Sequence, residues 1–259
     1  MASSPKQTQY FVLSHKGMVR ANNEDKAVVE SLGDNNGNKI HIAVLADGVG
    51  GHTAGEVASR IAVNTIINEL RGSRFFDPHS ALDDAIEKAN QAILDDIAQH
   101  PIRKGMGTTC VCALILGNTL YPAHLGDSRL YLLRGKSLSQ LTRDHTMLEE
   151  YRHLTIVHPD NITRSHPLAH VLSRYLGSAD PIDIDHELTG VGQEARTLEL
   201  LPGDVLLLCS DGLTDLLSEK EIVHILLTCS GRKRSQTLVL RALEKGGHDN
   251  TTVIVLDIP

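Results

Sequence analysis

Three apolar stretches of this chain each lead into an aspartate that stands beside a glycine, and a fourth aspartate, beside an asparagine, opens the last apolar stretch. The four aspartates are Asp47, Asp127, Asp211 and Asp249. Runs rich in Val, Ile and Leu are typical of buried strands, and a strand end holds a side chain in a fixed position. The sequence therefore predicts a fold in which several strand ends bring carboxylates into tight turns.

Carboxylates that converge repel one another and are costly to desolvate unless a cation neutralises them. Their hard oxygen atoms are ligands for magnesium, manganese or calcium. Any single one of these aspartates is explained at least as well by a role in a turn or a helix N-cap. The four together favour a dispersed metal site.

The composition limits the class of protein. With 259 residues, 41% hydrophobic and 22% charged, the chain has the make-up of a globular protein of one large domain or two small ones. The net charge of -7 argues against a nucleic-acid binder with a broad basic surface. The sequence shows no signal peptide and no apolar stretch long enough to cross a membrane, so we expect a cytoplasmic protein without a membrane tether.

The apolar pattern predicts strands and helices in separate blocks. Strands are expected at 9–14, 40–46, 109–116, 119–125, 129–133, 204–209 and 252–258, and helices at 53–70, 79–99, 218–228 and 234–245. Turns at Gly117–Asn118 and at Gly135 favour antiparallel pairing and an α+β layered fold. The four cysteines lie in apolar runs without the spacing of a zinc site, and we interpret them as small buried side chains.

Histidines and prolines gather in the segment 143–188, where the helical pattern is broken. We interpret this segment as an inserted surface lobe whose histidines lie on a solvated surface, which argues against a zinc site or a pH sensor there. Two other histidines, His124 and His248, flank aspartates of the predicted site and are candidates for hydrogen-bond partners.

The segment ADGVGGH at 46–52 combines a strand, a glycine-rich turn and the start of a helix. It fails as a nucleotide phosphate loop, because its spacing is wrong and Asp47 would repel a bound phosphate. A metal ion between the carboxylate and a phosphate removes this conflict. The glycines then allow the backbone to approach the ion, with one carbonyl as a ligand.

Seven short segments fit one known pattern. They are GMVRANNED at 17–25, ADGVGGH at 46–52, GMGTT at 105–109, HLGDSR at 124–129, TRDHT at 142–146, SDGL at 210–213 and GGHDNTTVIV at 246–255. In this order they closely resemble the metal-dependent serine/threonine protein phosphatases of type 2C, in their bacterial branch. The resemblance implies one catalytic domain over 1–259. It also implies an α-β-β-α sandwich with two central, mostly antiparallel sheets and a flap at about 143–188.

The resemblance also implies a set of ligands for two Mn²⁺ or Mg²⁺ ions. Asp47 would bridge the ions and the Gly48 carbonyl would bind one of them, while Asp211 and Asp249 would complete the other. Asp127 would share a third, weaker ion with Asp211.

Two more residues take roles from the same resemblance. Asp25 matches an acid that orders metal-bound water in the outer shell, and Arg20 matches the arginine that clamps the phosphate, where a guanidinium offers a planar fork. A hydroxide shared by the two ions would attack phosphorus in line, with no covalent phosphoenzyme. The general acid is unassigned, and we hypothesise that His52 is not essential.

The implied substrates are phosphorylated proteins, the products of a serine/threonine kinase, and the implied state is a monomer. The flap is expected to tune recognition of protein substrates, because the stretch 149–161 looks shortened relative to the family. Two alternatives remain at this stage. One is a catalytically silent module that binds phosphoproteins, and the other is a two-metal phosphodiesterase.

Overall fold

Two antiparallel sheets form the centre of the molecule. The computed structural model describes residues 8–33, 39–50, 54–154, 167–190 and 195–259. One sheet has the order β1 (Gln9–His15), β11 (Thr251–Asp257), β10 (Val205–Cys209), β7 (Arg129–Arg134) and β8 (Ser137–Gln140). The other has the order β2 (Asp25–Gly33), β3 (Lys39–Val49), β5 (Cys110–Leu116), β6 (Thr119–Leu125) and β9 (Leu198–Glu199), and β4 (Gly107–Thr108) pairs with the end of β3.

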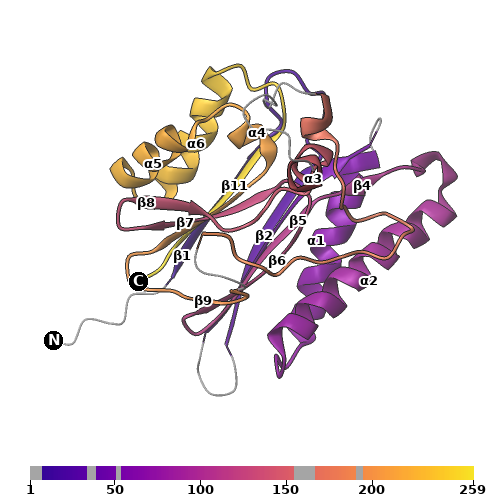
Figure 1. Cartoon of the computed structure of the whole chain (residues 1–259), viewed down its shortest axis with the longest axis horizontal. Helices are drawn as coiled ribbons and strands as arrows, with labels where there is room; N and C mark the ends of the chain where they lie inside the picture. Colours follow the sequence, from indigo (N-terminus) through magenta and orange to yellow (C-terminus); the bar gives the residue numbers. More distant parts are fainter. Residues whose placement is uncertain (1–7, 34–38, 51–53, 155–166, 191–194) are drawn as a thin grey trace.

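Helices cover the outer faces of both sheets. Figure 1 shows α1 (Ala54–Gly72) and α2 (Pro78–Gln99) on one side of the sandwich, and α5 (Glu219–Thr228) and α6 (Arg232–Glu244) on the other. The shorter helical elements are η1 (Pro101–Arg103), α3 (Met147–Leu154), η3 (Pro167–His170) and α4 (Asp211–Thr214). The predicted α+β class and the four-layer α-β-β-α sandwich are therefore confirmed.

Three apolar layers fill the spaces between these four layers. Along β3, Ile42 and Val44 face α1 and α2, whereas Ala43 and Leu45 face the other sheet. Along β10, Leu206 and Leu208 join the layer between the sheets, while their neighbours pack under α5 and α6. A strand covered on both faces carries no polar face, which explains the uninterrupted apolar runs in the sequence.

The ends of the strands and helices follow local chemistry. α2 begins after Asp77, whose side chain accepts hydrogen bonds from the backbone N–H groups of His79 and Ser80. Gly117 and Gly135 have φ angles of 61° and 62° in the turns that join β5 to β6 and β7 to β8. These positive angles suit glycine and confirm the two predicted hairpins.

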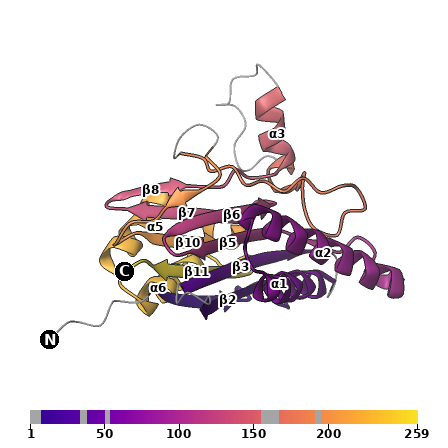
Figure 2. The same ribbon diagram turned by 90° about the horizontal axis from the view of Figure 1, so that it is seen from below.

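Some elements were not predicted. β2 lies at one edge of its sheet and is mostly only partly buried, and its apolar run is just three residues long, Ala27–Val29, between polar residues. β8 is four residues long and also forms an edge. α3 lies in the segment 143–188, and Figure 2 shows it standing out from the sandwich.

The second half of that segment departs from the predicted surface lobe. Leu176 is buried and pairs with Thr108, and Asp185 pairs with His124 of β6. His186 is buried, so the expectation of solvated histidines was wrong for this residue. His145, which belongs to the TRDHT segment of the family pattern, is also buried. The ring of His186 makes hydrogen bonds to the Asp83 carboxylate and the Pro122 carbonyl. These bonds replace the hydrogen bonds to water that the ring loses on burial. His158 and His166 lie outside the described residues.

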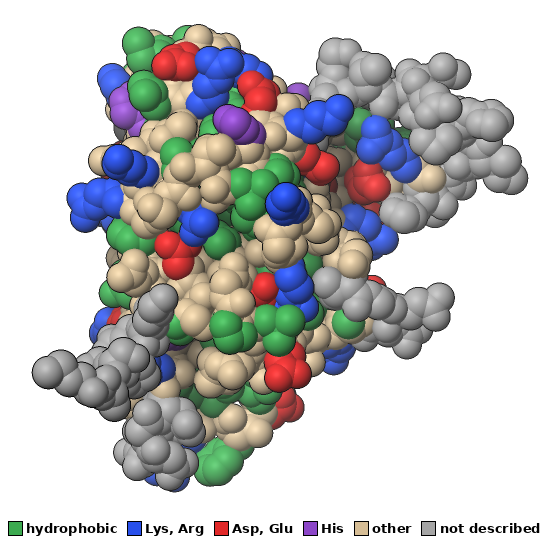
Figure 3. All heavy atoms as spheres, turned by 90° about the vertical axis from the view of Figure 1, so that its left-hand side faces the viewer, with side chains coloured by type: hydrophobic (Ala, Val, Ile, Leu, Met, Phe, Trp, Pro, Cys, Tyr) green, Lys and Arg blue, Asp and Glu red, His purple; other side chains and the backbone are tan. Residues whose placement is uncertain are grey.

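The surface carries mixed charge. On the face shown in Figure 3, Lys and Arg side chains are scattered among acidic and apolar ones. Among the described residues, no helix has the length and apolar character needed to span a membrane.

Candidate metal centre

One pocket of about 410 Å³ brings most of the predicted site residues together. Its lining includes Arg20, Asp47, Gly48, Asp127, Asp211 and Asp249. They come from positions far apart in the sequence, so only the tertiary fold unites them. Of the predicted set, Asp25 alone is absent from this lining, and it is buried.

Strand ends position these side chains, as the sequence predicted. Asp47 lies near the end of β3, and the register of β2 places Asp25 directly opposite it. Asp211 follows β10 and begins α4, while Asp249 precedes β11 by two residues. Asp127 lies in the link between β6 and β7. Both sheets thus supply carboxylates to one pocket.

Gly48 is required by close packing. A Cβ atom at this position would lie 2.2 Å from the Gly55 carbonyl oxygen at the start of α1. The Gly48 N–H donates to the Glu24 carbonyl at 3.1 Å. Any side chain at Gly48 would therefore push α1 away from the end of β3 and distort the pocket.

Asp25 supports the pocket through hydrogen bonds. One of its oxygens, Oδ2, accepts from the Ser210 hydroxyl at 2.8 Å, and the oxygen of that hydroxyl accepts from the backbone N–H of Thr252 at 3.0 Å. The other oxygen, Oδ1, is buried and has no hydrogen-bond partner among the described residues. Burial raises the pKa of Asp25 to about 6. A buried carboxylate oxygen without a partner calls for a water or a cation.

The other carboxylates are also held in an unfavourable setting. Burial, with repulsion from neighbouring carboxylates, raises the pKa values of Asp47 and Asp211 well above their ordinary range. Burial raises the pKa of Asp127 to about 7, and the Asp144 carboxylate adds to this effect. Arg20 contacts the site through one ion pair, in which Nη2 lies 2.6 Å from Oδ2 of Asp249.

Clustered carboxylate oxygens with raised pKa values match the donor set of a divalent cation such as Mn²⁺ or Mg²⁺. The unpartnered Oδ1 of Asp25 points to the same kind of group. The residues of this pocket therefore fit the predicted metal ions.

Comparison with known proteins agrees with this geometry. Residues 19–247 match the family model described as protein phosphatase 2C. The chain belongs to the protein phosphatase 2C family.

Relatives of this phosphatase 2C chain include the serine/threonine protein phosphatase PstP of Mycobacterium tuberculosis, which is 36% identical over 254 residues. That match covers 96% of this chain but only 45% of the relative, so the chain spans about half the length of PstP. The serine/threonine phosphatase stp of Listeria welshimeri is 31% identical, and the match covers 93% of this chain and 92% of that protein. A solved structure of the PstP catalytic domain with two manganese ions superposes with a TM-score of 0.80 at 33% identity, covering 97% of this chain and 99% of that one.

Three residues of this phosphatase 2C pocket were missed from the sequence. Glu24, His170 and Asp215 line it, and ligand atoms of His170, Asp211 and Asp215 all lie within 4.8 Å of one another. Asp215 stands four residues after Asp211, about one helical turn, and this spacing was the available signal. His170 comes from η3, whose distance in sequence from Asp211 gave no such signal.

A second pocket of about 450 Å³ adjoins the first. The two share Asp127, His170, Asp211 and Asp215. Its lining includes Leu148 and Glu149 of α3, so this part of the predicted flap borders the site. His52, which we hypothesise is not essential, lies outside the described residues, so that hypothesis stays a prediction.

The two histidines that flank site aspartates behave differently. His248 is exposed and lines the pocket beside Asp249. His124 is buried, and its Nε2 donates to the Arg143 carbonyl at 2.9 Å. Burial lowers the pKa of His124 to about 4, so this ring is neutral at ordinary pH.

Proposed function

We propose that this phosphatase 2C chain hydrolyses phosphoserine and phosphothreonine in proteins and depends on Mn²⁺ or Mg²⁺. One observation carries the proposal. Carboxylates from both sheets converge in a single pocket, and an exposed arginine lies at its edge. The names of the relatives and the two manganese ions in the PstP structure support it.

In this proposal, Asp47, Asp211 and Asp249 would hold the two principal ions, with Asp47 serving both and the Gly48 carbonyl as a further ligand. Asp127 and Asp211 would hold a third, weaker ion, and the position of Asp215 supports adding it to this set. Asp25 orders water behind the ligands. When bound, the ions supply the positive charge that activates water toward phosphorus and neutralises the phosphoryl oxygens.

Arg20 binds the phosphoryl group in this proposal. Its guanidinium is half-exposed and contacts Asp249, so it can reach the pocket without being enclosed by it. A planar guanidinium binds two phosphoryl oxygens at once and offsets the charge that spreads over them in the transition state. The cysteines take no part in this proposal, since none of them lines the pocket. Cys110, Cys112 and Cys209 are buried within the sheets, as predicted, whereas Cys229 follows α5 and is only partly buried, so the prediction of a buried side chain was wrong for it.

We also propose the wider setting. The substrates are products of a serine/threonine kinase, the protein acts as a cytoplasmic monomer, and residues 1–259 form one catalytic unit with a flap at about 143–188 that tunes substrate choice. Pairing of β1 with β11, from opposite ends of the chain, supports the single unit. The net charge of -7 supports partners other than nucleic acid.

The test measures hydrolysis of p-nitrophenyl phosphate and a phosphothreonine peptide with Mn²⁺, with and without a chelator. The wild type and Asp211→Asn are compared. Activity on both substrates that is lost with the chelator and in the variant supports the proposal. Inactivity of the folded, manganese-loaded wild type would favour a silent binding module, and preference for bis-p-nitrophenyl phosphate would favour a phosphodiesterase.

A further inference from the structure

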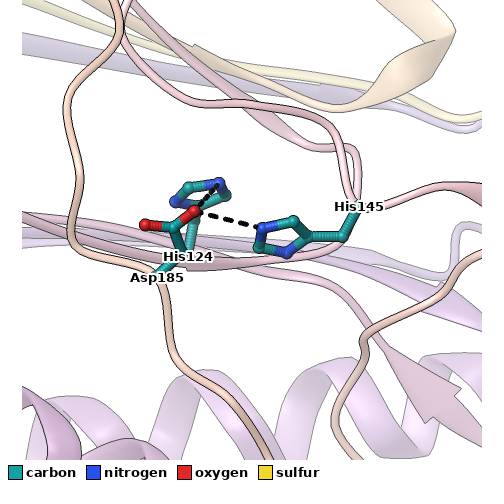
Figure 4. Close-up of side chains that lie close together, drawn as sticks. All are labelled: His124, His145 and Asp185. Atoms are coloured by element: carbon teal, nitrogen blue, oxygen red, sulfur yellow. Dashed lines mark hydrogen bonds and ion pairs between the residues drawn. The ribbon is translucent and has the colours of Figure 1, made fainter. Parts of the chain in front are cut away.

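Figure 4 shows a cluster of two buried histidines, His124 and His145, with the partly buried Asp185. None of the three lines the metal pocket, but His145 contacts the residue next to Asp127. His145 holds Gly126 by two hydrogen bonds. The backbone N–H of His145 donates to the Gly126 carbonyl at 2.9 Å, and the Gly126 N–H donates to Nδ1 of the His145 ring at 3.2 Å. Gly126 directly precedes Asp127, so these bonds define the turn that carries the Asp127 carboxylate.

The same turn is constrained from its other side. Gly126 has a φ angle of 99°, and a Cβ atom there would lie 2.6 Å from Cγ2 of Thr109. The Thr109 hydroxyl bonds to the Ser128 hydroxyl at 2.7 Å and accepts from the Asp47 N–H at 2.9 Å. The residues on both sides of Asp127 are therefore anchored, one by His145 and the other by Thr109.

Asp185 fixes the orientation of the His145 ring. Because Nδ1 accepts a hydrogen bond from Gly126, the ring proton lies on Nε2, which faces Oδ2 of Asp185 at 3.4 Å. Asp185 is itself anchored, since its backbone N–H and C=O both bond to His124. The His124 ring stacks on the His145 ring, with centroids 4.6 Å apart and an interplanar angle of 14°. The ring is thus held by an acceptor on one edge and a stacked ring on one face.

The bonding pattern argues against a metal ion inside this cluster. Nε2 of His124 donates to the Arg143 carbonyl, and Nε2 of His145 carries the proton that faces Asp185. The nitrogens nearest the carboxylate therefore present hydrogens to their surroundings, whereas a ligand must present a lone pair. The cluster is a hydrogen-bonded support.

We propose that His145, oriented by Asp185, is a positioning residue that holds the Asp127 carboxylate in place for the weaker third ion. This inference rests on the proposed function, because that function supplies the ion. A group that orients a metal ligand commonly changes metal affinity by about 10- to 100-fold when it is removed. The side chain of His145 touches neither the pocket nor the substrate, so its effect passes through Gly126.

The chain offers a matched control in His186, which follows Asp185 in the sequence. His186 is also buried, and it also bonds to a backbone carbonyl, that of Pro122, and to a carboxylate, that of Asp83. Its bonds connect the 183–188 segment to α2 and β6, and it makes no contact with Gly126 in the described structure. His186→Ala therefore removes a comparable buried histidine without loosening the Asp127 turn.

The experiment titrates the full chain with Mn²⁺ by isothermal calorimetry and follows the weakest site, with thermal unfolding of the metal-free protein measured in parallel. His145→Ala is expected to weaken that site by about tenfold while the tighter sites are unchanged. His145→Asn is expected to recover most of the affinity, because its amide oxygen can replace Nδ1 as the acceptor for Gly126. His186→Ala is expected to lower the unfolding temperature but to leave manganese affinity unchanged.

Equal manganese affinities in the wild type, His145→Ala and His186→Ala would overturn the inference, as would equal losses in both alanine variants. Should His145→Ala fail to fold, Asp185→Asn against Asp83→Asn makes the same comparison, with weaker binding expected only in Asp185→Asn. A wild type that binds no Mn²⁺ would instead count against the proposed function itself, so the two failures are distinguishable.

Discussion

Carboxylates of the metal pocket differ sharply from those elsewhere in the molecule. Asp204 is at least as buried as the carboxylates of the pocket, yet the Arg134 guanidinium donates to both its oxygens, at 2.9 and 2.6 Å. Arg71 likewise contacts both oxygens of Glu30 and lowers its pKa. In the pocket, by contrast, burial and like charges raise the pKa values of Asp47 and Asp211. The comparison teaches that the lack of a cationic side-chain partner, rather than burial alone, sets Asp47 and Asp211 apart from the paired carboxylates, while Asp249 of the same pocket contacts Arg20.

Removing a pocket carboxylate tests the functional side of this comparison and has the largest expected effect. Asp47→Asn and Asp211→Asn should each lower kcat/KM for p-nitrophenyl phosphate with Mn²⁺ by at least about 1000-fold, because charge stabilisation by the ions is lost. Asp204→Asn, at a paired carboxylate far from the pocket lining, should retain activity. Comparable activity in Asp211→Asn and the wild type would show that the pocket carboxylates are no more important for activity than the paired ones.

Supplying the missing cation should stabilise the folded protein. Mn²⁺ at about 100 times its dissociation constant adds about 2.7 kcal/mol to the free energy of unfolding. For a chain of this size, this predicts a rise of about 5–10 °C in Tm by calorimetry, reversed by a chelator. The same addition to Asp47→Asn should give a much smaller rise. An unchanged Tm of the wild type on addition of Mn²⁺ would contradict the inference that the pocket carboxylates are stabilised by a bound cation.

Breaking a paired carboxylate should affect stability alone. Arg134→Met leaves the Asp204 carboxylate buried, and its remaining hydrogen-bond partner among the described residues is the backbone N–H of Leu201. The free energy of unfolding should fall by about 2 kcal/mol, as measured by denaturant titration. Activity with Mn²⁺ should stay within about twofold, given that the pair is remote from the site. A large loss of activity at unchanged stability would show that the two regions are coupled.

The pH dependence of the metal-free protein gives the smallest effect. Folded-state pKa values of about 6 for Asp25 and about 7 for Asp127 lie above the value of about 4 expected in the unfolded chain. At pH values between the unfolded-state and folded-state pKa, the folded state binds more protons than the unfolded state. The stability that these protonated groups contribute is therefore lost as the pH rises through the folded-state pKa. With a chelator present, these two groups should make the free energy of unfolding about 1.8 kcal/mol higher at pH 6 than at pH 8. Asp127→Asn should flatten this slope, and a slope of opposite sign would contradict it.

The sequence predicted the layered fold well because most of its strands are buried on both faces. It missed β2 because the apolar run of this edge strand, Ala27–Val29, is too short to predict a strand. The four aspartates at strand ends were visible locally, but Asp215 was overlooked because it lies two residues beyond the SDGL segment that carries the resemblance. The contact between His145 and Asp185 spans 40 residues and depends on the path of the intervening chain, so no local pattern could reveal it.

The Ser210 hydroxyl bonds to Asp25 of one sheet and to Thr252 of the other. The pocket therefore lies between the two sheets. Asp25 and Asp47 come from β2 and β3 of one sheet, and Asp211 and Asp249 flank β10 and β11 of the other. A cation bound by carboxylates from both sheets would link the two sheets to each other. Any sliding of one sheet over the other alters its coordination, so hydrogen exchange in both sheets should slow together when the ion binds.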